Sequence, residues 1–146
     1  MGATAGIVCG KNGFGCTIIS GGVPEDHDIE VPANLLSRGE QLCWLSEEAR
    51  RVVSSGACDV AGVQKAAGGG MFGASPERNE VEAAVQMGLH QAGVVARRLT
   101  TESVRAALGV PKAPKAYNTL MRRADVAARS NEQRRHQYLL ALAAST

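Results

Sequence analysis

The stretch from residue 58 to residue 78, CDVAGVQKAAGGGMFGASPER, holds side chains that are well placed for chemistry. It begins with a short apolar run, continues with the amide of Gln64 and the amine of Lys65, and then enters a glycine cluster. Residues at the carboxyl end of a buried strand lie where α/β proteins bind ligands. A metal ion such as Mg²⁺ prefers carboxylate oxygens, whereas an amide beside an amine suits an anion. The stretch therefore predicts the rim of a cleft with a neutral to positive lining.

Positive charge is concentrated in the last third of the chain. Residues 1–93 carry 11 acidic and 6 basic side chains, a net charge of −5, whereas residues 94–146 carry 3 acidic and 10 basic ones, a net charge of +7. Such asymmetry favours a polyanion-facing surface, although solvated helical arginines would give the same pattern. The candidate contacts to DNA or RNA are Lys65, Arg98, Lys112, Lys115, Arg129, Arg134 and Arg135.

Other chemistry finds less support in the sequence. The four cysteines, Cys9, Cys16, Cys43 and Cys58, form no CxxC pair, so we expect buried free thiols and neither zinc nor disulfides. We expect no cofactor. Aromatic residues make up only 3% of the chain, which argues against base stacking on a single strand. No apolar run approaches the roughly 18 residues of a membrane span, so we expect a cytoplasmic protein without a membrane partner.

Hydrophobic periodicity predicts the elements that position these residues. The chain of 146 residues is long enough for a single domain, 1–146, with its own core. Residues 4–9 and 14–20 are β-prone, and GKNG between them predicts a hairpin turn through positive φ angles of Asn and Gly. GGVPEDHD predicts a second turn, followed by a short strand at residues 29–32.

Helices and buried strands alternate after this hairpin. Apolar residues at helical spacing predict a helix from about Ser37 to Gly56, and DVAGV then predicts a buried strand of a parallel sheet. Ser75 and Pro76 predict the start of a helix of small residues that closes at Gly93. Residues 94–99 predict another strand. Short helices are expected after Thr100 or Thr101 and around residues 117–121, and a terminal helix is basic in its first half and apolar in its second.

Three stretches and this order of elements resemble the RNase H-like superfamily in its RuvC-like branch. AGIVCGKNGFGCTII is similar to the first hairpin of that family, DVAGVQKAAGGG to its strand that ends in Glu, and HQYLLALAA to its terminal helix. The likeness is nearer to a small bacterial branch than to the true junction resolvases. It implies an RNase H-like α/β fold with a mixed five-stranded sheet flanked by helices.

The resemblance also implies where catalytic acids would stand. That superfamily hydrolyses phosphodiesters with two divalent ions that carboxylates hold. The matching positions here carry Val8, Gln64 and, in the terminal helix, Gln137 or one of its neighbours, and no register places an acid at any of them. The resemblance therefore implies a catalytically degenerate domain without catalytic residues or a metal. Its groove would instead bind phosphates through Lys65, Arg134 and Arg135.

Two alternatives stay open. One is a protein-interaction or assembly module, such as a homodimer, that uses the helix at 76–92 and the apolar pair Met71 and Phe72. The other is a metal-dependent nuclease whose acids have moved, with Asp28, Glu30, Glu80 and Glu82 as candidates. We expect Glu80 and Glu82 to lie on the solvated side of their helix, which weighs against this alternative.

Overall fold

One mixed sheet organises the computed structural model, which describes residues 2–66 and 75–146. Its strands lie in the order β3-β2-β1-β4-β5. They are β1 (Ala3–Cys9), β2 (Gly13–Ser20), β3 (Val23–Glu30), β4 (Cys58–Gln64) and β5 (Val95–Leu99). β1, β4 and β5 are parallel to one another, whereas β2 is antiparallel to both β1 and β3. The predicted five-stranded α/β sheet is confirmed.

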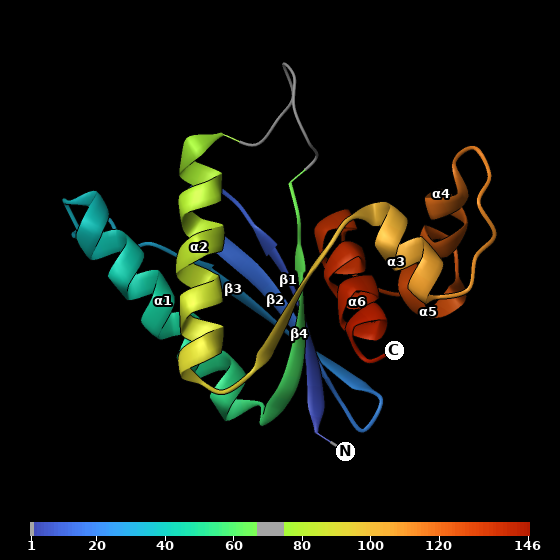
Figure 1. Ribbon diagram of the computed structural model, residues 1–146, viewed down its shortest axis with the longest axis horizontal. Coiled ribbons are helices and arrows are strands. Elements are labelled where there is room, and N and C mark those ends of the chain that lie inside the picture. Colours follow the sequence, from blue (N-terminus) through green and yellow to red (C-terminus); the bar gives the residue numbers. More distant parts are fainter. Residues whose placement is uncertain (1, 67–74) are drawn as a thin grey trace.

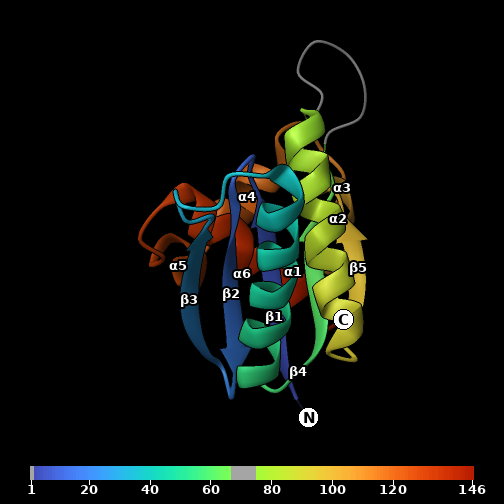
Figure 2. The same ribbon diagram turned by 90° about the vertical axis from the view of Figure 1, so that its left-hand side faces the viewer.

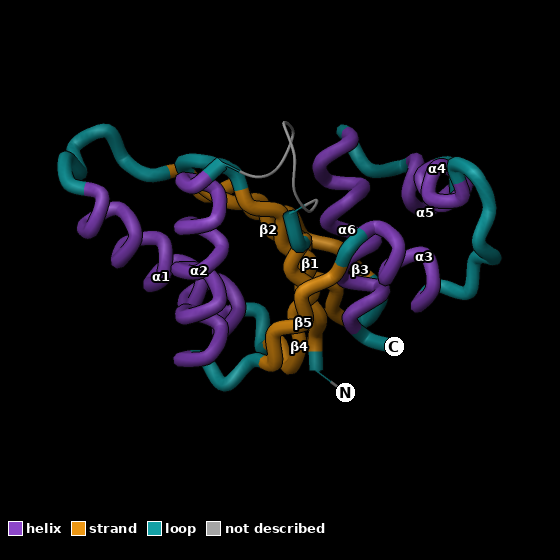
Figure 3. The backbone as a smooth tube through the Cα atoms, turned by 45° about the horizontal axis from the view of Figure 1, so that its top comes forward, coloured by secondary structure: helices purple, strands orange, loops and turns teal. Residues whose placement is uncertain are grey.

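Helices cover both faces of this sheet (Figure 1). On one face lie α1 (Arg38–Ser55) and α2 (Pro76–Gln91), side by side in front of the strands in Figure 2. On the other face lies α6 (Glu132–Ala144), with α3 (Thr101–Ala107), α4 (Ala116–Met121) and α5 (Ala124–Ala127) beside it. Figure 3 shows the two groups of helices on opposite sides of the strands. None of the helices described is long and apolar enough to cross a bilayer.

The parallel strands define one edge of the sheet, because their carboxyl ends meet on one side of it. We name this side, where β1, β4 and β5 end, the carboxyl edge. The helix α6 runs in the opposite direction, so its first turn lies at the carboxyl edge (Figure 1). At its other end, Arg97 donates hydrogen bonds to the carbonyl oxygens of Ala143 (3.2 Å) and Ala144 (3.1 Å). This cation satisfies carbonyl groups that a helix end leaves free.

Close contact between α6 and the sheet depends on glycines. A methyl group at Gly6 would overlap the carbonyl oxygen of Gln137, and one at Gly62 would lie 2.6 Å from that of Leu140. The α6 backbone therefore lies directly on β1 and β4. On the opposite face, Gly88 of α2 lets the backbone of α1 approach at Ser46, so the small-residue helix packs on a helix as its composition suggested.

The predicted helix starts are confirmed in their capping bonds. Ser37 accepts from the backbone of Glu40, Ser75 from that of Arg78, and Thr100, rather than Thr101, from that of Ser103. The predicted free thiols are confirmed as well, and they are buried except at Cys43. Burial raises the pKa of the Cys9 thiol to about 12, so this group stays protonated at neutral pH.

The predicted second turn and third strand are both present, but their predicted bounds, 21–28 and 29–32, were wrong. Only Gly21 and Gly22 form the turn, with φ angles of 58° and 80°, and β3 then pairs with β2 along its full length. As an edge strand, β3 tolerates Pro24 and a run of charged residues that indicated a turn. The first turn is present, since the Gly10 amide donates to the carbonyl oxygen of Gly13 (2.8 Å), but the positive φ angles predicted for it are wrong.

Candidate functional site

The three positions that the family resemblance singled out lie on one face of the sheet. Ile7 pairs with Val63, so Val8 and Gln64 follow side by side at the carboxyl edge. Val8 packs against the core beneath α6. Gln137 belongs to α6 itself, and its backbone lies over β1. The fold therefore brings Val8, Gln64 and Gln137 to the α6 side of this edge.

Gln137 is fully buried and uses both ends of its amide. Its Nε2 donates to Oγ1 of Thr17 (3.1 Å), and its Oε1 accepts from Nε2 of Gln133 (3.0 Å). Thr17 in turn donates to Oδ1 of Asp26 (2.6 Å). Gly15 leaves room for this chain, because a methyl group there would overlap the Gln137 amide. Gln137 thus fastens α6 to β2.

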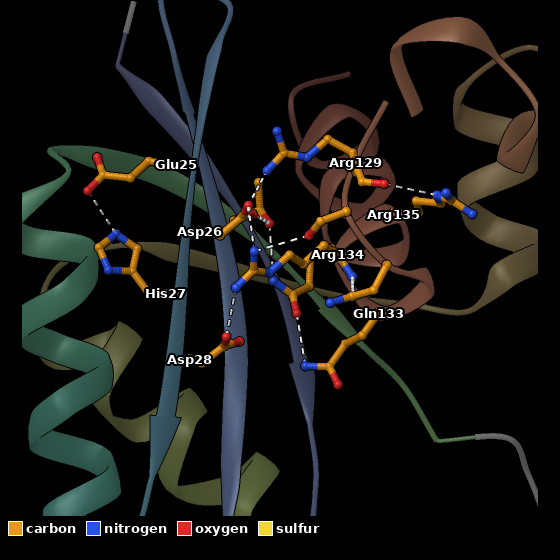
Figure 4. A network of polar contacts seen from close by, with 12 residues as sticks. Glu25, Asp26, His27, Asp28, Arg129, Gln133, Arg134 and Arg135 are labelled. Atoms are coloured by element: carbon orange, nitrogen blue, oxygen red, sulfur yellow. Dashed lines mark hydrogen bonds and ion pairs between the residues drawn. The ribbon is translucent and has the colours of Figure 1, made fainter. Parts of the chain in front are cut away.

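Arginines in the first turn of α6 and just before it form ion pairs with acids of β3. Asp26, Asp28 and Glu30 are alternate residues of β3, so they share the face that α6 covers, and we call them the acidic stripe. Arg129 pairs with Asp26. Arg134 pairs with Asp28 (Nη2 to Oδ2, 2.9 Å) and lies 3.8 Å from Asp26. Figure 4 shows both guanidinium groups directed at these carboxylates.

The expected groove of Lys65, Arg134 and Arg135 is not assembled at one point. Arg134 reaches β3, whereas Lys65 follows β4, and these two strands lie three strand spacings apart, about 14 Å. Arg135 turns away from the sheet and donates to the carbonyl oxygens of Arg129 and Ala127, both at 3.3 Å. Arg134 and Arg135 therefore bind different neighbours, and Lys65 lies apart from both.

The expectation that Glu82 faces solvent was wrong. Glu82 is only 3% exposed, and it pairs with Arg78 and with Arg98 (Nε to Oε2, 2.6 Å). Arg78 also donates to the carbonyl oxygen of Gln64, so this cluster lies behind the end of β4. The sequence did carry a signal, because Glu82 shares a helical stripe with Val85 and Leu89. Two guanidinium groups offset the cost of burying one carboxylate.

Other cations at or near the site have no such partners. Lys65, Lys112 and Lys115 are exposed, and no side-chain hydrogen bond or ion pair joins them to the described residues. The same holds for Lys11 in the β1–β2 turn and for Arg122 at the end of α4. We call these five residues the free cations. The hairpin sequence GKNG held the signal for Lys11, since a turn between two strands exposes its central side chains.

A cleft of about 680 Å³ opens beside the carboxyl edge. The β1–β2 turn, the end of β3 and the first turn of α6 line it. Its charges are mixed, because the lining includes Lys11 and Arg134 as well as Asp28 and Glu30, together with the polar side chain of Gln133. An anion that enters the cleft would therefore meet repulsion from Asp28 and Glu30, the two residues of the acidic stripe that line it.

The residues at this edge do not fit the metal pair that the resemblance implies. Val8 offers no ligand atom, and both ends of the Gln137 amide are already bonded. Mg²⁺ prefers several carboxylate oxygens. Across residues 2–66 and 75–146, no three His, Cys, Asp or Glu side chains gather closely enough to hold a metal ion. Three of the four acids proposed as relocated ligands are engaged, Glu80 with Arg38 at 3.0 Å and Glu82 and Asp28 as described above, whereas Glu30 has no ion pair to the described residues.

The predicted interaction surface is only partly described. Met71 and Phe72 lie outside the described residues. The small-residue side of α2 packs on α1, whereas Met87 on the same helix is 59% exposed. An assembly role for this helix stays a prediction.

Comparison with known proteins identifies the fold. RuvC of Thermus thermophilus in complex with a Holliday junction substrate matches 98% of this chain and 92% of its own, with a TM-score of 0.72 and 14% identity. A second structure of RuvC from Thermus thermophilus matches 97% and 92%, with the same TM-score and 18% identity. No protein-family model and no curated protein matches the chain. The chain has the RNase H-like fold in the arrangement found in RuvC, as the sequence resemblance predicted.

Proposed function

We propose that this chain is a RuvC-like domain that binds nucleic acid without cleaving it. The proposal that the chain does not cleave nucleic acid rests on the residues at the carboxyl edge. Val8, Gln64 and Gln137 stand on the face where a two-metal nuclease of this fold would need carboxylates. A valine and two amides, one of them buried and hydrogen-bonded at both its oxygen and its nitrogen, supply no anionic ligand for Mg²⁺.

The proposal that the chain binds nucleic acid rests on the fold and on the free cations. A RuvC structure with the same arrangement was solved with a Holliday junction substrate, which makes nucleic acid the first partner to test. Lys65, Lys112 and Lys115 are exposed and free to neutralise phosphates. Contacts of this kind position a nucleic acid but read no sequence. The arginines at the start of α6 contribute less, because the acidic stripe already holds them.

The layout of the chain suggests where the nucleic acid would lie. Lys11 and Lys65 are at the carboxyl edge, and Lys112 and Lys115 belong to the segment between α3 and α4. Figure 1 places that segment at the outer end of the group formed by α3, α4 and α5, on the α6 side of the sheet and away from α1 and α2. We therefore expect phosphates to run from the carboxyl edge across the α6 side of the molecule.

Fluorescence anisotropy with labelled four-way junction, duplex, single-stranded DNA and RNA tests the proposal. In EDTA, we expect binding that weakens steeply between about 50 mM and about 200 mM salt, as counterion release requires. Replacing Lys112 and Lys115 together by Ala should lower the affinity and reduce the salt slope by about two, one for each lost phosphate contact.

The matched control removes two charges elsewhere. Arg50 and Arg51 are exposed on α1, on the opposite face, and pair with Glu47 and Glu48. Replacing both by Ala removes the same formal charge but should leave the salt slope unchanged. Absence of binding by micromolar protein at low salt would contradict the proposal. Cleaved strands after addition of Mg²⁺ or Mn²⁺ would instead favour the nuclease with relocated acids.

A further inference from the structure

The ion pair between Arg134 and Asp28 lies at the rim of the cleft and is accessible. The guanidinium of Arg134 donates to Oδ2 of Asp28 at 2.9 Å, and the two side chains are 31% and 57% exposed. Both residues line the cleft, together with Lys11. The carboxylate of Asp28 therefore already binds the guanidinium group of Arg134 at the rim of the cleft.

We propose that Asp28 competes with phosphate for Arg134 and so sets the affinity of the cleft for a polyanion. Carboxylate and phosphate oxygens bind the same guanidinium donors. A phosphate of the nucleic acid would take the place of Asp28 on Arg134, with Lys11 as a second cation in the same cleft. The inference rests on the proposed function, and it assigns Asp28 a role that opposes binding.

The contacts of the acidic stripe single out Asp28 for this role. Asp26 is deeper, with 15% of its side chain exposed, and it also bonds Thr17 and Arg129. Releasing Asp26 would break the link between α6 and the sheet. Among the described residues, Arg134 is the side-chain partner of Asp28, so rotation of Asp28 towards solvent frees Nη2 of Arg134 and leaves that link intact, while Nη1 keeps its hydrogen bond to Ser130 (3.1 Å).

The strength of this pair suits competition by a polymer. Exposed ion pairs contribute little net stability, so the pair opens at low cost. Neighbouring phosphates on a nucleic acid act together, because their field is that of a line of charges. A single small anion lacks this advantage and meets the repulsion of Asp28 and Glu30. Asp28 therefore favours polyanions over isolated anions.

The test compares two neutralised acids of one strand. Asp28→Asn releases Arg134, whereas Glu30→Gln removes the same charge from the same cleft at a residue with no ion pair to the described part of the chain. Measured by anisotropy with a short duplex, Asp28→Asn should raise the affinity about fivefold and steepen the salt slope by about one. Glu30→Gln should raise the affinity about twofold without a change in slope.

A double variant assigns the gain to Arg134. In an Asp28→Asn, Arg134→Gln protein, the extra affinity and the extra slope should both disappear. Equal gains from Asp28→Asn and Glu30→Gln, with wild-type binding intact, would overturn the competitor role alone. So would a gain that survives in the double variant. Absence of binding by every variant would overturn the proposed function as well, whereas binding gained only by Asp28→Asn would support competition.

Discussion

Two basic regions of this molecule differ in what surrounds their cations. Just before α6 and in its first turn, Arg129 and Arg134 lie against Asp26 and Asp28 of β3. Around the end of β4 and between α3 and α4, Lys65 and its fellow free cations face solvent. The first region has more charge density, but its charge is already neutralised. Positive charge counted along a sequence is thus not the same as positive charge available to a ligand.

The difference also separates structural from functional roles. The held arginines join helix, sheet and edge strand, so their loss should appear in stability. The free cations join nothing in the described structure, so their loss should appear in binding. The position that matches a catalytic acid in the terminal helix, Gln137, belongs to the first region, since it fastens α6 to β2.

The largest expected effect is the loss of a held arginine. Arg129→Ala leaves Asp26 without its main cation in a site where both side chains are mostly covered, so we expect destabilisation by about 3 kcal/mol. Urea unfolding measures it. The control is Arg123→Ala, which breaks an exposed pair with Asp125 and should cost less than about 1 kcal/mol. Equal losses of stability in the two variants would mean that the mostly covered pair contributes no more than the exposed pair does.

The next effect tests the packing of the held region without changing its charge. Gly15→Ala places a methyl group against the Gln137 amide, which has no room to move, so we expect about 2 kcal/mol of destabilisation. Gly39→Ala, in the first turn of α1 with no atom nearby, should be neutral or stabilise by up to about 1 kcal/mol. Thermal unfolding separates the two. If Gly15→Ala left the thermal unfolding unchanged, Gln137 would not anchor α6 to the sheet.

A smaller effect contrasts the two regions in binding. Lys65→Ala should weaken duplex binding about threefold and lower the salt slope by about one, because a free cation is lost. Arg134→Ala should change the affinity by less than about twofold, because a phosphate must displace Asp28 before it can bind Arg134. A larger loss from Arg134→Ala than from Lys65→Ala would reverse the comparison.

The smallest effect concerns pH. Arg123, and to a lesser degree Tyr138, hold the pKa of Asp125 at about 2, below its ordinary value of 3.8. A depressed carboxyl pKa stabilises the fold above the unfolded value, and this contribution is lost as pH falls from about 4 towards 2. Arg123→Ala should return the Asp125 pKa, followed by NMR, towards 3.8. An unchanged pKa would mean that Arg123 is as free as Lys112.

The sequence predicted local features well and distant partners poorly. Capping serines, small-residue packing and the buried β4 all follow from spacing within a few residues. The pairing of Arg129 with Asp26 spans 103 positions, so no local pattern contains it. It was further hidden because the charges of β3 indicated a turn. The alternate spacing of Asp26, Asp28 and Glu30 was the available signal, since it places three acids on one face of a strand.

The buried Glu82 shows the same limit. Its helical phase placed it among apolar residues, but the composition of the surrounding stretch favoured solvent. Its burial is stabilised because Arg98 from β5 and Arg78 from the same helix both pair with its carboxylate. Sequence patterns of period and capping could not reveal that arrangement, because it depends on which strands become neighbours.

The central claim is that the carboxyl edge binds nucleic acid but has no carboxylate set for hydrolysis. One reaction tests it most directly: a labelled four-way junction with enough protein to be fully bound by anisotropy, incubated with Mg²⁺ or Mn²⁺ and then run on a denaturing gel. We expect a bound junction whose strands stay intact. Cleavage that EDTA abolishes would contradict it.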